Sequence, residues 1–93
     1  MDFHIPARGW IIFTKENCKY CTKTTSLVPE AERVPCDHFL GDCRDVFLAR
    51  MKDLTGRQHC TFPMVFHNGN FVGGFTETSK YVERLDAFKP VEF

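Results

Sequence analysis

The sequence lacks an apolar run long enough to cross a membrane, and it lacks an excess of charge of either sign. Lysine and arginine total 12, aspartate and glutamate also total 12, and the cations are scattered along the chain. A membrane span would need about 20 consecutive apolar residues, so no membrane partner is expected. A nucleic-acid-binding protein would need a basic face, so no nucleic-acid partner is expected either.

A secretory signal and an even cysteine count are also missing. Segment 1–6 is short and mixes polar with apolar residues, so a cytoplasmic, reducing location is expected. The five cysteines are an odd number, whereas a secreted disulfide scaffold would usually show an even one. The simpler interpretation is one redox-active pair plus free thiols at Cys36, Cys43 and Cys60.

Neither an internal repeat nor a linker or low-complexity segment divides the chain. Its 93 residues suit one small domain. Ten Phe, two Tyr and one Trp supply large side chains for burial, so a core can form without disulfides. We expect residues 1–93 to fold as a single domain.

Apolar runs separated by breaks predict the order strand, helix, strand, helix, strand, strand, helix. The predicted strands are 9–13, 34–40, 63–67 and 70–72. The first run is continuously apolar, which favours a central strand buried on both faces. Pro35 favours an edge position for the second strand, and Asn68-Gly69 predicts a tight hairpin. The expected fold class is α/β, a four-stranded mixed sheet (β-α-β-α-β-β-α) with helices on both faces.

Caps and apolar spacing define the two later helices. Asp42 is expected to cap the second helix and Gly56 to end it, and Thr76 or Thr78 is expected to cap the third. The apolar positions at helical spacing are Val46, Phe47, Met51 and Leu54, then Tyr81, Val82, Leu85 and Phe88.

Cys18 and Cys21 are spaced as C-x-x-C between the first predicted strand and the first helix, which is typical of a redox pair. The start of a helix favours a thiolate at Cys18, and Cys21 is close enough to attack a mixed disulfide there. Lys15, Lys19 and Lys23 either support that thiolate or form a solvated face. Half of a structural zinc site is the other interpretation, but no second pair of ligands has the usual spacing.

Three segments resemble, in order and spacing, the dithiol type of the glutaredoxin family within the thioredoxin-fold superfamily. They are Cys18-Lys19-Tyr20-Cys21, Thr61-Phe62-Pro63 and Gly73-Gly74-Phe75-Thr76-Glu77, and the resemblance extends from about Trp10 to Phe88. It implies an enzyme that uses glutathione as co-substrate to reduce protein disulfides and protein–glutathione mixed disulfides. Electron donation to ribonucleotide reductase is one form of that activity.

The resemblance also implies roles for individual residues. Cys18 would be the nucleophile and Cys21 the resolving thiol. Pro63 matches the family's cis-proline, and the backbone of Phe62 would pair with the cysteinyl part of glutathione. The other residues expected to bind glutathione are Lys15 at the glycine carboxylate, Tyr20 beside the sulfurs, Thr76 and Glu77 at the γ-glutamyl end, and Thr61, Gly74 and Phe75 between them.

Several positions depart from the family pattern. Lys19 stands where dithiol glutaredoxins usually have Pro, Phe62 replaces Val, Phe75 replaces Cys or Tyr, and Glu77 stands where Asp is commoner. Two alternatives stay open: a thioredoxin-like reductant served by a flavoprotein reductase, and a glutaredoxin that binds a [2Fe–2S] cluster. Otherwise no metal is expected. The expected partners are glutathione and disulfide-containing or glutathionylated proteins, and a monomer is expected.

Overall fold

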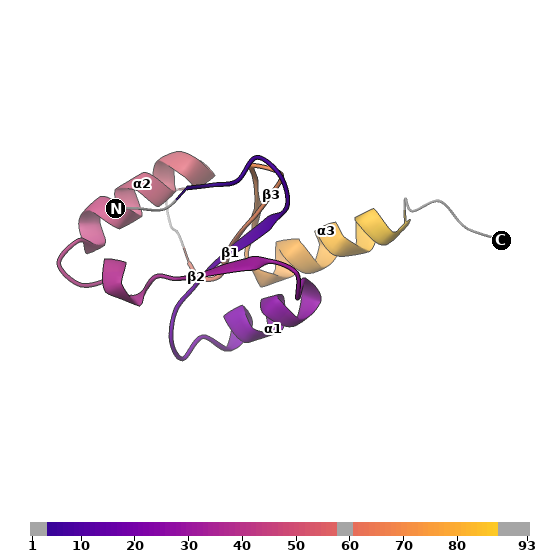
Figure 1. The fold of residues 1–93 in the computed structure, drawn as a ribbon, viewed down its shortest axis with the longest axis horizontal. Coiled ribbons are helices and arrows are strands. Elements are labelled where there is room, and N and C mark those ends of the chain that lie inside the picture. Colours follow the sequence, from indigo (N-terminus) through magenta and orange to yellow (C-terminus); the bar gives the residue numbers. More distant parts are fainter. Residues whose placement is uncertain (1–3, 58–60, 88–93) are drawn as a thin grey trace.

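A computed structural model describes residues 4–57 and 61–87 of the chain. Its elements are β1 (Trp10–Thr14), α1 (Lys19–Leu27), β2 (Glu32–Pro35), the 3-10 helix η1 (Asp37–Phe39), α2 (Arg44–Thr55), β3 (Met64–His67), β4 (Asn70–Gly73) and α3 (Phe75–Ala87). The predicted fold class is confirmed, because these elements form a four-stranded mixed sheet with helices on both faces (Figure 1). Within these residues, no helix is long and apolar enough to span a membrane.

The strand order in the sheet is β2-β1-β3-β4, so β1 is central and β2 lies at an edge, as predicted. β1 pairs in parallel with β2, where Ile12 lies opposite Arg33. β3 pairs antiparallel with both β1 and β4. A four-residue loop connects the carboxyl end of β1 to α1, and the two motif cysteines lie at the start of that helix.

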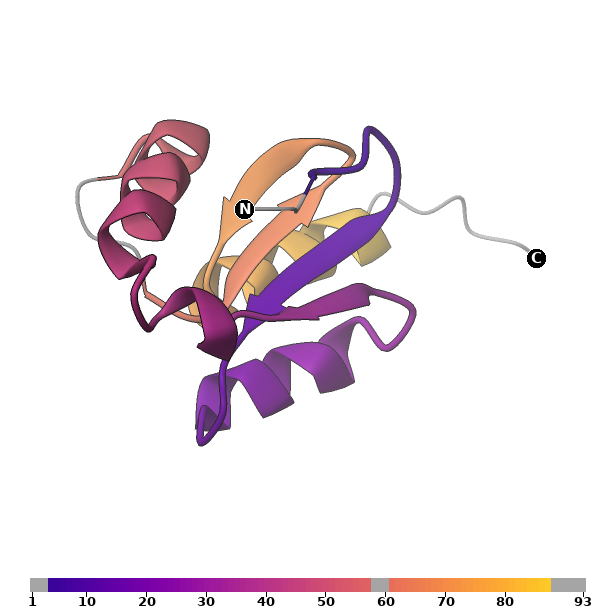
Figure 2. The ribbon, with the colours of Figure 1, turned by 60° about the vertical axis from the view of Figure 1, so that its left-hand side comes forward.

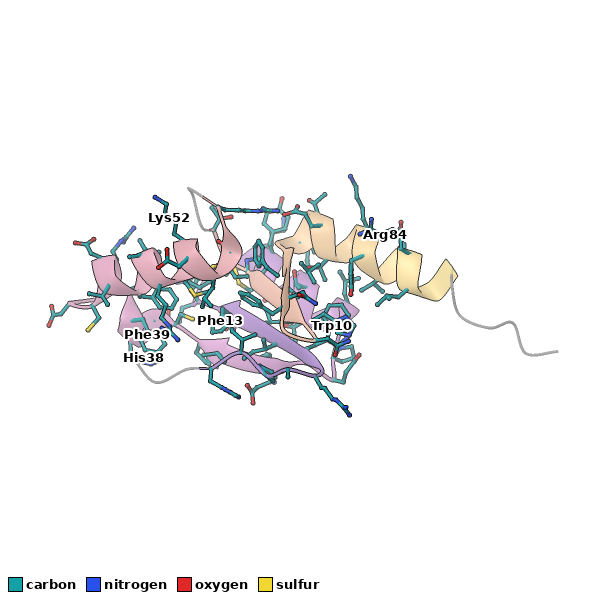
Figure 3. All side chains as sticks on the ribbon, turned by 90° about the horizontal axis from the view of Figure 1, so that it is seen from above. Trp10, Phe13, His38, Phe39, Lys52 and Arg84 are labelled. Carbon is teal, nitrogen blue, oxygen red and sulfur yellow. A yellow bond between two sulfur atoms is a disulfide. The ribbon has the colours of Figure 1, made fainter. Side chains whose placement is uncertain are left out.

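Successive side chains of a strand point to opposite faces of the sheet, so there is one core on each face. One core contains Ile11, Phe13, Cys36, Phe39, Phe47, Met51, Met64 and Phe66. The other contains Ile12, Val28 and Val65, bordered by Trp10, Ala31, Val72 and Val82. The first lies against α2, and the second lies against α1 and α3 on the opposite face (Figure 2). Viewed from above, Phe13 and Phe39 lie toward α2, whereas Trp10 lies toward α3 (Figure 3).

The second strand is shorter and earlier than the expected segment 34–40. Its pairing with β1 runs from Glu32 opposite Ile11 to Pro35 opposite Thr14. Beyond Pro35 the chain turns into η1, where the Leu40 N–H donates to the Asp37 carbonyl. β1 ends at Thr14, opposite Pro35, so residues after Pro35 have no strand to pair with. The end of β2 is therefore determined by its neighbour in the sheet and not by its own sequence.

The helix caps differ from expectation at both N-termini. The N-cap residue of α2 is Cys43 rather than Asp42, and its side chain makes no cap hydrogen bond. α3 begins at Phe75, so Thr76 and Thr78 lie inside its first turn and neither caps it. Gly56 ends α2 as predicted, in the left-handed region at φ 71°.

The expected apolar stripes are buried only in part. Phe47 and Met51 are fully buried and Val82 borders a core, but Val46, Leu54 and Leu85 are exposed by 64%, 37% and 39%. α2 therefore contacts the sheet through a narrower stripe than its apolar spacing suggests. Phe88, the last member of the predicted stripe in α3, lies outside the described residues.

The hairpin between β3 and β4 forms at Asn68-Gly69, as predicted. Both residues have positive φ, 51° and 83°, which suits a two-residue turn between twisted antiparallel strands. Asn68 also exchanges two hydrogen bonds with Gly9, at 2.8 and 2.9 Å, and these tie the turn to the segment before β1.

Candidate active site

The cysteines of the C-x-x-C motif lie where β1 leads into α1, and they are joined as a disulfide with Cα atoms 5.2 Å apart. Cys18 is the N-cap residue of α1, with extended backbone. The Cys21 N–H donates to Cys18 Sγ at 3.2 Å. When the bond is reduced, this N–H and the positive end of the helix favour a thiolate on Cys18.

The two sulfur-bearing residues differ in their access to solvent. Cys21 is 4% exposed, whereas Cys18 is only half-buried. Cys21 lies in the first turn of α1, whose inner face packs toward the sheet, and Cys18 precedes that turn. An incoming sulfur therefore meets Cys18 first, which agrees with the order of roles that the resemblance implies.

A groove of about 200 Å³ is formed by eight residues from three segments: Tyr20, Thr61, Phe62, Pro63, Gly74, Phe75, Thr76 and Glu77. The resemblance implies nine glutathione-binding residues, and the structure brings together all of them except Lys15. Their binding of glutathione stays a prediction, but their convergence from α1, the start of β3 and the start of α3 is a property of the fold.

The floor of the groove depends on the close approach of two backbone segments. The Phe62–Pro63 peptide bond is cis, as the resemblance implies. A Cβ atom at Gly74 would lie 3.5 Å from the Pro63 carbonyl oxygen, so the start of α3 packs directly on the start of β3. The resemblance therefore identified the two segments that meet here.

One wall of the groove is aromatic. The rings of Tyr20 and Phe75 have centroids 5.7 Å apart. Lys23 places its Nζ 5.3 Å from the Tyr20 ring centroid and 5.8 Å from that of Phe75. Lys23 is not among the residues predicted to bind glutathione, although its position three residues after Tyr20 puts both on one helix face.

Lys15 lies at the border between this groove and a hollow on the other side of Cys18. Its Nζ is 5.8 Å from the ring centroid of Phe62, which lines the groove. Lys15 itself lines the hollow, which has a volume of about 650 Å³ and also contains Cys18 and Cys21 in its wall. Sequence reasoning missed the hollow, whose other lining residues are Thr14, Asn17, Lys19, Thr22, Thr25, Ser26 and Arg33.

Glu77, at the end of the groove, has its carboxylate already engaged. Oε1 accepts hydrogen bonds from the Gly74 N–H and from Arg57 Nη1, both at 3.1 Å. The Gly74 N–H, and then Arg57, hold the pKa of Glu77 below its ordinary value. Glu77 therefore carries a negative charge at neutral pH, in an orientation suited to a cationic group of a ligand.

Gly73 allows this arrangement because Glu77 occupies the space beside it. A Cβ atom at Gly73 would lie 2.6 Å from Glu77 Cβ and 2.6 Å from Oε1. The residue also has φ 134°, a conformation that favours glycine. Gly73 is thus required both by its backbone conformation and by the Glu77 side chain.

The remaining described thiols lie in contrasting surroundings. Cys36 is fully buried, and burial, together with the charge of Asp37, raises the pKa of its thiol to about 12. Its S–H donates to the Val34 carbonyl at 3.3 Å. Cys43 is exposed, and Cys60 lies outside the described residues. Within 4–57 and 61–87, no three His, Cys, Asp or Glu side chains gather as a metal site.

No family model matches the chain. The chain is 34% identical over 70 residues to Glutaredoxin-C4 of Arabidopsis thaliana. The matched residues are 73% of this chain and 50% of the relative, so the chain spans about half the length of the curated relative it matches.

Solved structures show the same fold. The crystal structure of glutaredoxin 1 from Francisella tularensis complexed with cacodylate has a TM-score of 0.71 at 21% identity, covering 85% of this chain and 96% of that one. A buckwheat glutaredoxin–glutathione complex has a TM-score of 0.68 at 22% identity, covering 89% of this chain and 74% of that one. These likenesses show the fold. The identity to Glutaredoxin-C4, together with the Cys18–Cys21 pair at the start of α1, shows that the chain belongs to the glutaredoxin family, with the two-cysteine pattern of its dithiol members.

Proposed function

We propose that this protein is a glutathione-dependent thiol–disulfide oxidoreductase, a glutaredoxin that reduces protein disulfides and protein–glutathione mixed disulfides. The observation that carries the proposal is a redox-active Cys18–Cys21 disulfide at a helix N-terminus, with a groove of about 200 Å³ beside it. A buckwheat glutaredoxin of the same fold was crystallised with glutathione, which supports glutathione as the occupant of this groove.

The described state is the oxidised one, so the cycle begins with its reduction. A glutathione thiolate attacks Cys18 Sγ, the more exposed sulfur, and the electron pair of the broken bond passes to Cys21 Sγ, which takes up a proton. A second glutathione thiolate attacks the glutathione sulfur of the mixed disulfide. Glutathione disulfide and the Cys18 thiolate leave, so two glutathione molecules supply the two electrons.

The reduced protein then acts on its substrates through the Cys18 thiolate. On a protein–glutathione mixed disulfide, Cys18 attacks the glutathione sulfur and releases the protein thiol, and another glutathione regenerates the thiolate. On a protein disulfide, Cys18 forms a mixed disulfide with one substrate sulfur. Cys21 then attacks Cys18 Sγ, releases the substrate dithiol and restores the intramolecular bond.

The groove supplies complementary groups for an extended glutathione. The backbone of Phe62 would pair with the cysteinyl peptide groups as an added strand does. The Glu77 carboxylate would receive the γ-glutamyl amino group, which would join Arg57 around the same carboxylate. Lys15, at the opposite border, would attract the glycine carboxylate. Tyr20 would cover the sulfurs from the side of α1.

The test is reduction of hydroxyethyl disulfide with glutathione, NADPH and glutathione reductase. We expect turnover with glutathione and none when NADPH and thioredoxin reductase, without glutathione or thioredoxin, replace the glutathione system. Cys18→Ser serves as the inactive control. Absence of turnover by protein whose circular dichroism shows the native fold would refute the function, and dependence on thioredoxin reductase would favour the alternative reductant.

The cellular role extends the same chemistry. We propose that the protein acts as a monomer in the cytoplasm, where glutathione is kept reduced, and that ribonucleotide reductase is one acceptor of its electrons. Sedimentation of the purified chain, fractionation of cells and a ribonucleotide reduction assay with this protein as the sole dithiol donor test these three statements separately.

A further inference from the structure

We propose that the hollow on the α1–β2 side of Cys18 binds an acidic segment of the protein substrate, next to the substrate's own disulfide. This inference rests on the proposed exchange at Cys18. It adds a second recognition site to the glutathione groove, with a different ligand chemistry and on a different side of the reactive sulfur. The class of substrate it specifies is a protein whose target cysteine is flanked by carboxylates.

The first support is the charge of the hollow. Lys15, Lys19 and Arg33 line it, and none of its ten lining residues is an aspartate or glutamate. All three cations are solvent-exposed. None of the three forms an ion pair within 4.0 Å with another residue of 4–57 or 61–87, where the pair that meets this distance is Arg57–Glu77.

The nearest acidic residues along the chain do not line the hollow. Glu16 follows Lys15, Glu32 precedes Arg33 in β2, and Asp37 lies just after β2. The Glu16 backbone N–H donates to Asp37 Oδ1 at 2.9 Å. None of these three side chains lines the hollow. The wall therefore presents cations to any occupant. A carboxylate-bearing occupant gains from Lys19 and Arg33 whether or not glutathione is bound, and from Lys15 when the groove is empty.

The second support is the hydrogen-bonding capacity of α1. Thr22, Thr25 and Ser26 line the hollow, and their hydroxyls donate to backbone carbonyls of Cys18, Cys21 and Thr22 at 3.4, 2.9 and 3.2 Å. A hydroxyl that donates its proton still offers lone pairs as acceptors. The hollow thus offers cations for carboxylates and hydroxyl oxygens that can accept hydrogen bonds from N–H groups. An acidic peptide can use both, whereas a simple anion without N–H groups can use only the cations.

The third support is the position of the sulfurs. Cys18 and Cys21 line the hollow and are absent from the lining of the glutathione groove. The hollow is also the larger of the two, at about 650 against 200 Å³. A peptide segment seated there can bring its cysteine to Cys18 while the groove stays open for glutathione.

A binding measurement tests the site without any turnover. The probe is a short peptide with carboxylates on both sides of a central serine, in place of cysteine, and the comparison peptide has glutamines in place of the carboxylates. Titration calorimetry of the oxidised protein should show tighter binding of the acidic peptide, and added salt should weaken it. Because the assay needs no exchange, it can succeed even if the hydroxyethyl disulfide assay fails, and fail even if that assay succeeds.

Variants locate the binding. Arg33→Gln should weaken binding of the acidic peptide by about 1.4- to 5-fold, the range for one exposed ion pair. Lys19→Gln should do the same. Arg8→Gln removes an exposed arginine that does not line the hollow, and it should leave binding unchanged. Heteronuclear NMR with the acidic peptide should shift the signals of Thr22, Thr25 and Ser26.

A kinetic measurement then connects the site to exchange. With acidic and glutamine-flanked disulfide peptides as substrates, the ratio of their kcat/KM values should fall in Arg33→Gln and stay constant in Arg8→Gln. Equal binding of the two serine peptides would overturn the proposal. An equal loss of binding in Arg8→Gln and Arg33→Gln would also overturn it. So would displacement of the bound acidic peptide by inorganic phosphate at the same concentration as by unlabelled peptide, because the hollow would then be a general anion site.

Discussion

Arg57, two residues after the end of α2, forms an ion pair with Glu77 in the first turn of α3, with Nη1 and Oε1 3.1 Å apart. The two side chains are 50% and 41% exposed, so the pair contributes little to the free energy of unfolding. Its larger effect is on the charge and direction of the Glu77 carboxylate at the end of the groove. The ion pair therefore matters more for the candidate site, where it holds the Glu77 carboxylate, than for the stability of the fold.

Replacing Arg57 by Gln should raise the pKa of Glu77, but only part of the way to its ordinary value of 4.5, because the Gly74 N–H is the larger cause of the depression. The pKa is lowered on folding, so Glu77 stabilises the protein above pH 4.5, and that stabilisation is lost as the pH falls through the folded value. The difference in stability between wild type and Arg57→Gln, below about 1 kcal/mol at pH 7, should shrink on acidification.

The Glu77 pKa can be followed by carbon-detected NMR of its side-chain carboxyl, and stability by urea unfolding. Arg44→Gln, at the other end of α2, is the matched control and should leave the Glu77 pKa unchanged. An unaltered Glu77 pKa in Arg57→Gln would contradict the role of the ion pair.

Gly73→Ala should destabilise the protein by about 1–3 kcal/mol, the usual range for a residue forced into an unfavourable backbone conformation. Its Cβ atom would collide with Glu77 Cβ and Oε1, and its φ is 134°. The matched control is Gly41→Ala, where a Cβ atom meets nothing within 4 Å and no positive φ applies. Urea unfolding should show the control within about 0.5 kcal/mol of wild type. Equal stability of the two variants would show that Glu77 can move away without loss.

Cys18→Ser should abolish both reductase activities, since it removes the nucleophile. Cys21→Ser should keep the reduction of protein–glutathione mixed disulfides, which needs only Cys18 and glutathione, and lose dithiol reduction of protein disulfides. The two activities are measured with a glutathionylated peptide and with a disulfide-bonded protein. Activity of Cys18→Ser on the glutathionylated peptide would reverse the assigned roles.

The Cys36 thiol should resist alkylation in the native oxidised protein, because it is fully buried and its pKa is raised to about 12. Exposed Cys43 should react with iodoacetamide under the same conditions. Mass spectrometry on a Cys60→Ser background distinguishes them, and unfolding in urea should make both reactive. Equal labelling of the two thiols in the native protein would contradict the buried position of Cys36.

The raised pKa of the Cys36 thiol should make the free energy of unfolding depend on pH in the alkaline range. Its folded pKa is raised from 9.0 to about 12, so the unfolded chain ionises first and stability should fall as the pH rises above 9 toward 12. The slope for one proton is at most about 1.4 kcal/mol per pH unit. Cys36→Ala lacks this proton and should show a smaller slope between pH 9 and 10.5. The same slope in both proteins would locate the alkaline sensitivity elsewhere.

Structural features that depend on residues adjacent in the sequence could be predicted. The apolar run 9–13 indicated a central strand and Asn68-Gly69 a hairpin, and both are present. The end of β2 and the N-caps of α2 and α3 were predicted wrongly, because they depend on the length of β1 and on packing against the sheet. A good capping residue such as Asp42 does not cap when the helix begins one residue later.

The candidate site likewise has a part that could be predicted from the sequence and a part that only the structure shows. The resemblance named eight residues that the fold brings into one groove. It did not show that the Glu77 carboxylate binds Arg57, 20 residues away. Nor did it indicate Arg33 in the hollow, because Arg33 reaches the cysteines only through the parallel pairing of β1 and β2.

By itself, the sequence determined the redox pair, its place between a strand and a helix, and the order of elements, since these follow from covalent spacing and local periodicity. The tertiary structure alone decided which partners hold Glu77 and that a cationic hollow adjoins Cys18. Those properties depend on strand register and on which helix face is buried. Both are set by the packing of segments that are distant in the chain, so no local pattern contains them.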